Sequence, residues 1–348
     1  MVSHRPVLPM PSANRYALAA RRRRSAQPVC ALALGASLAA CNMTKLAATS
    51  TADVFHQAAP AFDEQLDYDF AKQAAPGSIM QLEGVLRVLP DNELLLFDAC
   101  KSWTSYAFGF VEEEMEIAAE RGDLQTADHQ RALAQRMHLR ARDLGRRLLK
   151  RKSSGFQQAA QRGPDALRAF LAEHFRDRAD APALLFTGFA WGAAIDISRD
   201  DPALVADLPI ARMLVERSVE LDENSENATG LAFLGYVDAS TSEAMGGRPE
   251  AGKKRFERAL ALTRHKALMV QMNFARSYAI EKQDRTLFLA LLQEVAKTGP
   301  DVNPSSRLTN EVARRRAVRL LRRVDELFDR SSTLSSSTKV ARAHGGSP

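Results

Sequence analysis

The chain has few cysteines and lacks the residue patterns of catalytic and metal sites. Its 348 residues contain three cysteines, Cys30, Cys41 and Cys100, without the paired spacing of a zinc site. The seven histidines are scattered, and neither a nucleophile elbow nor a phosphate-binding glycine loop is present. We therefore expect no catalytic residue, no metal and no cofactor, and a protein that is not an enzyme.

The sequence also lacks an alternating strand pattern and any Asn-Gly or Asp-Gly hairpin signal. Apolar positions three and four apart recur instead, most clearly from Leu308 to Phe328. Pro164, Pro202, Pro249 and Pro304 stand where helices would begin, because proline at the first helical position loses no hydrogen bond. We predict an all-α fold.

The first forty residues have the pattern of an export signal. The basic run Arg21–Arg24 precedes the apolar stretch Pro28–Ala40, whose 13 residues are too few to span a bilayer as a helix. The stretch ends in Leu38-Ala39-Ala40-Cys41, the pattern cut by the bacterial lipoprotein signal peptidase. We expect cleavage before Cys41 and acyl chains on its sulfur; the alternative is an ordinary secretory signal with a chance cysteine.

Cleavage at this point would change the charge balance. The chain carries 48 Lys and Arg residues against 42 Asp and Glu, and six arginines but no acidic residue precede Cys41. Removal of that segment leaves 42 charges of each sign. The excess positive charge therefore belongs to the export signal, and we expect no nucleic-acid partner.

Composition divides the chain into four segments. Residues 1–40 are the signal peptide, and the small polar residues of 41–60 suggest a tether linker. Residues 61–330 carry the helical periodicity, and the serine-rich residues 331–348 suggest a disordered tail. Only Cys100 remains in the helical domain, so it contains no internal disulfide.

The helical domain contains an irregular sequence repeat. Small and large residues alternate at spacings of four and three in Ser78/Leu82/Val85, Ala211/Val215/Ser218 and Gly252/Phe256/Ala259. Small residues let a second helix approach the first, as in tetratricopeptide pairs. We predict a degenerate tetratricopeptide-like helical-repeat array, an α-solenoid; the alternative is generic helix packing with the same spacing.

The segment from Ala183 to Ile195 is apolar on all sides. It contains Phe186, Phe189 and Trp191, with glycines between them. Such a helix is either buried in a large core or lines an apolar cavity. Phe186, Phe189 and Trp191 are therefore candidates for an apolar ligand site or a core helix.

Two charge clusters follow one another in the sequence. Glutamates crowd residues 112–120, and residues 131–152 hold nine Lys or Arg residues against one acid, Asp143. If the two segments are antiparallel helices, the clusters face each other. A solvated face and a contact with anionic lipid head groups are the alternatives.

From about residue 76 to 328 the chain resembles the T-component (TatT) family of TRAP transporter lipoproteins. The stretches that carry the likeness are Phe189-Ala190-Trp191-Gly192-Ala193-Ala194-Ile195, residues 200–209, Phe233-Leu234-Gly235, Gly246–Glu250, Phe256–Leu260, Gln283–Phe288 and the helix from Arg307 to Phe328. Gly252, where a tetratricopeptide usually has alanine, and an insertion at residues 236–248 depart from the pattern.

The resemblance implies a periplasmic, lipid-anchored accessory protein that partners the solute-binding component of a TRAP transporter. It also implies an internal apolar channel for a hydrophobic small molecule such as an organic acid. The alternative is a structural envelope lipoprotein without small-molecule cargo, and an unrecognised hydrolase is a third possibility. Asn42 favours sorting to the outer membrane; the sequence leaves open whether the chain forms a homo-oligomer.

Overall fold

The computed structural model describes residues 43–240, 243 and 246–328. Its contacts divide the chain into two units at Thr51, and residues 43–51 of the first unit are helical. The described part of the second unit, from Ala52 onward, consists of helices and turns and contains no strand. The all-α prediction is thus confirmed, and the packing is consistent with a helical-repeat array.

The N-terminal half of the second unit begins with a helix at residues 52–58. The helices that follow are α2 (Pro60–Asp63), α3 (Tyr68–Val88), α4 (Glu93–Tyr106), η1 (Ala107–Val111), α5 (Glu112–Glu120), α6 (Leu124–Lys152), α7 (Phe156–Gln161), α8 (Pro164–His174), η2 (Arg178–Asp180) and α9 (Ala181–Asp196). The side chains of Asp67, Asn92 and Asp123 accept hydrogen bonds from backbone N–H groups and so cap α3, α4 and α6.

The C-terminal half consists of shorter helices. They are α10 (Pro202–Val205), α11 (Leu208–Leu221), α12 (Ser225–Ala239), α13 (Pro249–Thr263), α14 (Leu268–Phe274), η4 (Ala275–Ala279), α15 (Arg285–Lys297), η5 (Pro300–Val302), η6 (Pro304–Ser306), α16 (Arg307–Leu321) and α17 (Val324–Leu327). Pro164, Pro202, Pro249 and Pro304 begin α8, α10, α13 and η6, as the sequence predicts.

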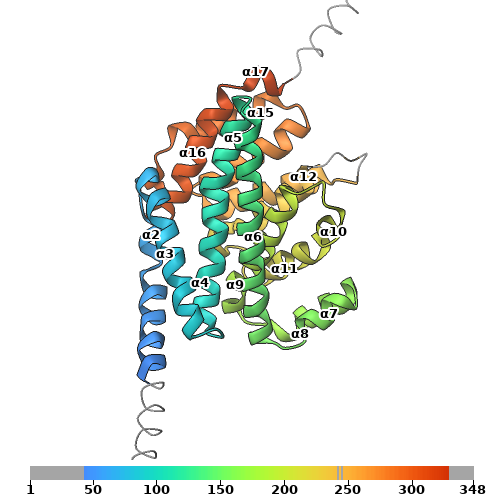
Figure 1. The fold of residues 1–348 in the computed structure, drawn as a ribbon. Helices are drawn as coiled ribbons and strands as arrows, with labels where there is room; N and C mark the ends of the chain where they lie inside the picture. Colours follow the sequence, from blue (N-terminus) through green and yellow to red (C-terminus); the bar gives the residue numbers. More distant parts are fainter. Residues whose placement is uncertain (1–42, 241–242, 244–245, 329–348) are drawn as a thin grey trace, which may run out of the picture. The chain divides into compact units, whose positions relative to one another are not determined.

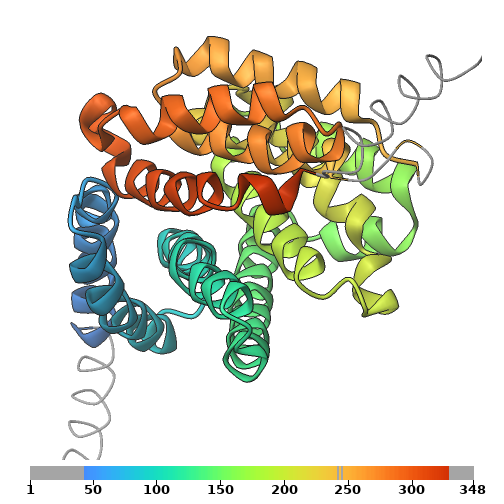
Figure 2. The same ribbon diagram turned by 90° about the horizontal axis from the view of Figure 1, so that it is seen from above.

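Within the second unit each long helix packs mainly against its near neighbours in the chain. Helix α6 lies against α4, α5 and α9, α9 against α11, and α12 against α13 (Figure 1). The exception is α16, which contacts α14 and α15 but also returns to α2 and α3 near the start of the unit (Figure 2). The last long helix therefore closes the array against its first helices.

Two of the three predicted repeat faces are buried. Ala211, Val215 and Ser218 are at most 1 % exposed, and Phe256 and Ala259 are fully buried. The third prediction is wrong, because Ser78 is exposed. Helix α3 instead buries the neighbouring stripe of Ala71, Ala75, Ile79, Leu82 and Leu86, which removes more apolar area from water.

Small residues allow α12 and α13 to approach closely. A Cβ atom added at Gly252 would lie 2.7 Å from the carbonyl oxygen of Gly235. Gly252 therefore replaces the usual alanine where the two backbones meet. Helix α12 continues to Ala239, so it takes up the first residues of the segment expected to be an insertion.

No helix in the described ranges is both long enough and apolar enough to cross a membrane. Cys41, the export signal and the C-terminal tail lie outside the described residues. Their assignment stays a prediction.

Candidate functional site

A cavity of about 450 Å³ lies inside the second unit, among α4, η1, α9, α12, α14 and α16. Protein interiors are close-packed and contain few voids larger than a water molecule. Ligand sites are typically apolar hollows of about 300–1,000 Å³ with a few polar groups. We call this hollow the central cavity and treat it as the candidate binding site.

Aromatic side chains form the middle of the central cavity. The rings of Phe108 and Phe189 meet edge to face with centroids 5.4 Å apart, and those of Phe189 and Phe233 do so at 5.8 Å. Met269 and Val270 extend the apolar wall. These surfaces offer neither hydrogen bonds nor charge, so they favour an apolar group.

Helix α9 directs its two phenylalanines to the central cavity and its tryptophan into the protein core. Phe186 and Phe189 both line the cavity, whereas Trp191 is not among the lining residues. The indole Nε1 of Trp191 donates a hydrogen bond to Asp207 (3.2 Å), and the guanidinium groups of Arg142 and Arg146 lie 5.5 Å from its ring. The helix thus has a cavity face and a core face, and a ligand-binding role for its phenylalanines stays a prediction.

Two π-helical turns lie at the cavity wall. The turn η1 interrupts the continuous helix from Glu93 to Glu120 and places Phe108, Gly109 and Phe110 in the lining. The turn η4 follows α14 and contributes Arg276. Such turns widen a helix locally and are frequent at functional sites.

One polar end of the central cavity is built around Lys101. Its ammonium group pairs with Asp63 (3.0 Å) and Glu226 (3.1 Å), and it lies 5.4 Å from the centre of the Phe186 ring. Burial alone would lower the pKa of Lys101, but the two carboxylates outweigh burial and raise it. Lys101 therefore stays charged beside the apolar wall.

The backbone next to the Lys101 end is strained. Glu226, Asn227 and Ala228 have φ values of 48°, 58° and 59°, in the left-handed region that side chains disfavour. The Asn227 amide holds this turn in place, because it donates to Ser306 (2.9 Å) and accepts from Asn303 (3.0 Å). The turn directs Glu226 toward Lys101.

The other polar end of the central cavity lies at the far end of α9. Asp196 follows Phe186 by ten residues, which is about 15 Å along a helix. The Tyr236 hydroxyl donates to Asp196 (2.9 Å), and burial, together with this carboxylate, raises the pKa of Tyr236 to about 12. Arg199 and Arg276 also line this end. The cavity is therefore apolar in the middle and polar at both ends.

The cysteine of the helical domain, Cys100, is not among the residues that line the central cavity. The thiol of Cys100 is buried, and burial raises its pKa to about 12, so it stays protonated and unreactive. Among the described residues, no cluster of His, Cys, Asp or Glu has the geometry to hold a metal ion.

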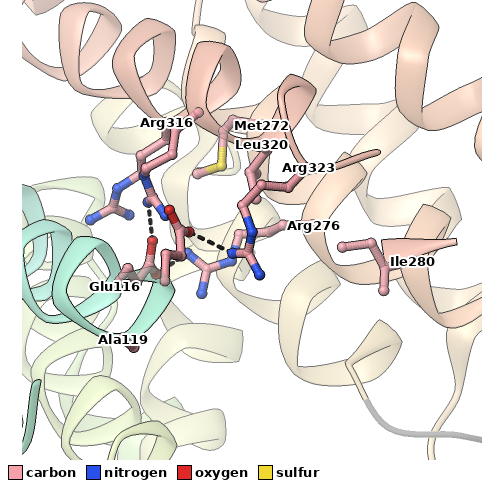
Figure 3. Close-up of a pocket in the computed structure, with 10 residues that line it drawn as sticks. Glu116, Ala119, Met272, Arg276, Ile280, Arg316, Leu320 and Arg323 are labelled. Atoms are coloured by element: carbon pink, nitrogen blue, oxygen red, sulfur yellow. Dashed lines mark hydrogen bonds and ion pairs between the residues drawn. The ribbon is translucent and has the colours of Figure 1, made fainter. Parts of the chain in front are cut away.

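The structure resolves which charged segments meet, a point that the sequence left open. Helix α5 packs against α6, where Glu112 pairs with His138 (2.7 Å) and not with a Lys or Arg residue. Glu113, Glu116 and Glu120 instead form ion pairs with arginines of α16 (Figure 3). The expectation considered only consecutive helices, whereas the return of α16 places a helix from the end of the chain against α5.

Sequence reasoning named Phe186 and Phe189, which line the central cavity, but did not name Phe108, Phe233 or the charged groups at its two ends as site residues. The signal at residues 183–195 is strong because every face of that helix is apolar. Phe108 and Phe233 also lie in apolar segments, but nothing in those segments distinguishes a residue that lines a cavity from one that packs in the core. Lys101 and Arg276 look like ordinary surface charges until the closed array buries them.

A known protein family matches most of the helical domain. Residues 64–328 match the family model described as TRAP transporter T-component, which is more than half of the chain. No curated protein sequence matches the chain. The matched range contains every helix from α3 to α17 and nearly the whole lining of the central cavity.

Proposed function

Because the chain belongs to the TRAP transporter T-component family, and so is an accessory component of such a transporter, we propose that it binds the solute receptor of that transporter and holds an apolar small molecule in the central cavity. The single observation that carries the second half of this proposal is the cavity of about 450 Å³ with phenylalanines in its middle. Burying an apolar chain against such walls is favourable by about 25 cal/mol for each Å² removed from water.

The charged groups at the ends of the cavity indicate which apolar molecules fit. A pure hydrocarbon would have no polar group to form a hydrogen bond with Lys101 at one end of the cavity or with the Tyr236–Asp196 pair at the other. An elongated molecule with a polar head, such as an organic acid with an aliphatic chain, matches both the walls and an end. We propose this class of ligand.

The location belongs to the proposal as well. We propose that the chain is exported, cut before Cys41 and tethered on the periplasmic side of a membrane by acyl chains on that residue. The tether would keep the helical domain beside its transporter. The test is the mass of the mature N-terminal peptide, which should carry acyl groups on Cys41; an unmodified thiol there would contradict the proposal.

Ligand carriage is tested by native mass spectrometry of the full chain purified in mild detergent, followed by solvent extraction. The proposal predicts a bound species that is released on unfolding and is amphiphilic. A protein that is consistently empty, and that does not take up medium-chain organic acids on incubation, would instead support a structural lipoprotein without cargo.

Receptor binding is tested by affinity capture from a periplasmic extract under native conditions. The proposal predicts enrichment of a TRAP solute receptor, identified by its peptides, over a control resin that carries an unrelated lipoprotein. Recovery of other envelope proteins without any solute receptor would contradict it.

A further inference from the structure

Helix α3 has an exposed face without charge. The helix lies at the edge of the array beside α4 and turns its buried stripe toward the core (Figure 1). The opposite side holds eight exposed residues that lie within about 120° of one another at 3.6 residues per turn. They are Phe70, Gln73, Ala74, Gly77, Met80, Gln81, Gly84 and Val88. We call this set the outer face of α3.

Large apolar side chains gather on the outer face of α3. Nine large apolar side chains are exposed in the described ranges, and three of them, Phe70, Met80 and Val88, belong to this face. A fourth, Leu66, stands just before the helix. Phe70 is 60 % exposed and Met80 64 %. Single exposed apolar residues are ordinary, but several on one face mark a site of interaction.

Two charged residues in the middle of α3 are engaged within the chain. Lys72 pairs with Glu114 of α5, and Glu83 pairs with Arg140 of α6. The solvent side of a surface helix usually carries charges that face water. The outer face of α3 instead offers only neutral groups.

Two glycines on the outer face have no explanation within the chain. A Cβ atom added at Gly77 or at Gly84 would meet nothing within 4 Å. Glycine in the middle of a helix is less stable than alanine, because it loses more conformational freedom on folding. Packing inside the single chain therefore gives no reason for glycine at these positions. A second helix backbone that approaches closely gives one.

The outer face is complementary to itself. In an antiparallel pair of two α3 helices with Gly77 at the centre, residues equally far before and after Gly77 lie opposite each other. The opposed pairs are Phe70 with Gly84, Ala74 with Met80, and Gln73 with Gln81. A large side chain thus meets a small one in the first two pairs, and two amides that can exchange hydrogen bonds meet in the third. A different partner helix would not require this symmetry about Gly77.

The charges at the two ends of α3 favour the same arrangement. Arg87 near the C-terminal end is exposed and forms no ion pair with the described residues. Asp67 and Asp69 stand at the N-terminal end; Asp67 caps the helix, and Asp69 is 3.5 Å from Arg315 but remains 68 % exposed. An antiparallel pair brings each Arg87 to the aspartates of the other copy. Opposite charges therefore meet at both ends of the contact.

We propose that the outer face of α3 is the contact surface of a homodimer, in which two copies of the chain pair antiparallel with Gly77 on the two-fold axis. None of the residues of this face lines the central cavity. The dimer therefore does not depend on the ligand or on the solute receptor proposed above.

Association is tested by sedimentation velocity of the full-length chain carrying Cys41→Ser, over a wide range of concentration. A monomer–dimer equilibrium is the expected result. Phe70→Gln should raise the Kd of the dimer about tenfold or more, because two phenyl rings lose their contacts. Leu124→Gln is the matched control, since Leu124 is 68 % exposed at the start of α6, and it should leave the Kd unaltered.

A chain that is monomeric at every concentration, or that forms trimers or larger rings, would overturn the proposal. So would equal Kd values in the parent and both variants, each shown to be folded by circular dichroism. If the chain is monomeric and Phe70→Gln abolishes capture of the solute receptor, the face belongs to the receptor, and the dimer is likewise refuted.

The two-fold axis is tested by cross-linking. With Cys30→Ser and Cys41→Ser, the buried Cys100 is the remaining native thiol. Gly77→Cys should then form a disulfide-linked dimer on mild oxidation, because the residue on the axis meets its own copy and the site has room for a side chain. Ser78→Cys lies about 100° around the exposed side of the helix and should cross-link at least tenfold less. Equal cross-linking at the two positions would contradict the proposed pairing.

Discussion

At the scale of single residues, the glycines of α9 show how closely its neighbours pack. A Cβ atom added at Gly188 would lie 2.6 Å from Cγ2 of Val215 and 2.8 Å from the carbonyl oxygen of Ala211. Side chains can shift, but the backbone of α11 cannot do so cheaply. Gly188 is therefore required for the contact between α9 and α11.

We expect Gly188→Ala to lower the free energy of unfolding by about 1–3 kcal/mol, because the added methyl group overpacks the core. Gly84 in α3 is the matched control, since a Cβ atom there meets nothing within 4 Å. Gly84→Ala should raise stability by up to about 1 kcal/mol, because alanine is the better helix former. Urea denaturation measures both changes; a loss of stability of similar size in the two variants would contradict the packing argument.

Glu116 gives a prediction about pH. Its pKa is about 2 in the folded chain and near 4.5 when unperturbed, so the unfolded state binds its proton first as pH falls. The stability that Glu116 contributes is fully present above about pH 4.5 and is lost as pH falls toward 2. The shift corresponds to roughly 3 kcal/mol.

Glu116→Gln should therefore be less stable than the unaltered chain at pH 7, and the difference should shrink as pH falls from about 5 to 2. Melting temperatures across this range measure the difference. A gap of constant size between the two proteins would show that Glu116 is not the titrating group.

At the scale of secondary-structure elements, the sequence predicts where helices begin better than where they depart from regular α-helical geometry. Asp201 caps α10 through the backbone N–H groups of Ala203 and Leu204, as the Asp-Pro pair indicates. The π turn at residues 107–111 carries no comparable signal, because Ala107 to Val111 reads as ordinary helix. It depends on the tertiary contacts of the closed array, and those bring Phe108 to the cavity.

The pairing of charged residues is likewise not predictable from the local sequence. Local reasoning matched the acidic segment with the next basic segment, 131–152, whereas three of its glutamates pair with α16, some 200 residues away. Ion pairs of this kind depend on topology, which helix periodicity does not encode. The two phenylalanines of α9 could be identified because the apolar character of the helix around them is visible in the local sequence.

The contact between α5 and α16 gives the prediction at this scale. Arg316 joins the two helices through Glu113 and through the carbonyl oxygen of Phe108. Arg316→Ala should lower the free energy of unfolding by about 3 kcal/mol, because a buried carboxylate loses a partner. Arg322→Ala, on the exposed side of the same region, should change it by less than about 0.5 kcal/mol. If the two substitutions lower the free energy of unfolding equally in denaturant titrations, the ion pairs do not hold α16 against α5.

At the scale of the second unit, the central cavity forms because α16 closes the helical array. An open repeat array buries its core between neighbours and leaves a concave surface. Here α16 returns to the first helices, and the space among α4, α9, α12 and α16 becomes a partly open hollow. The family match, which ends at residue 328, includes the helix that makes this closure.

The central claim is that the phenylalanine-lined cavity binds an amphiphilic ligand. It is tested most directly by titrating a fluorescent medium-chain fatty acid into the full-length chain carrying Cys41→Ser, which removes the expected tether and the need for detergent. Phe189→Trp, which fills the middle of the cavity, should weaken binding about tenfold or more. Trp191→Phe changes the other face of the same helix and should leave the affinity unaltered. Absence of saturable binding, or equal affinities in the parent and both variants, would contradict the account.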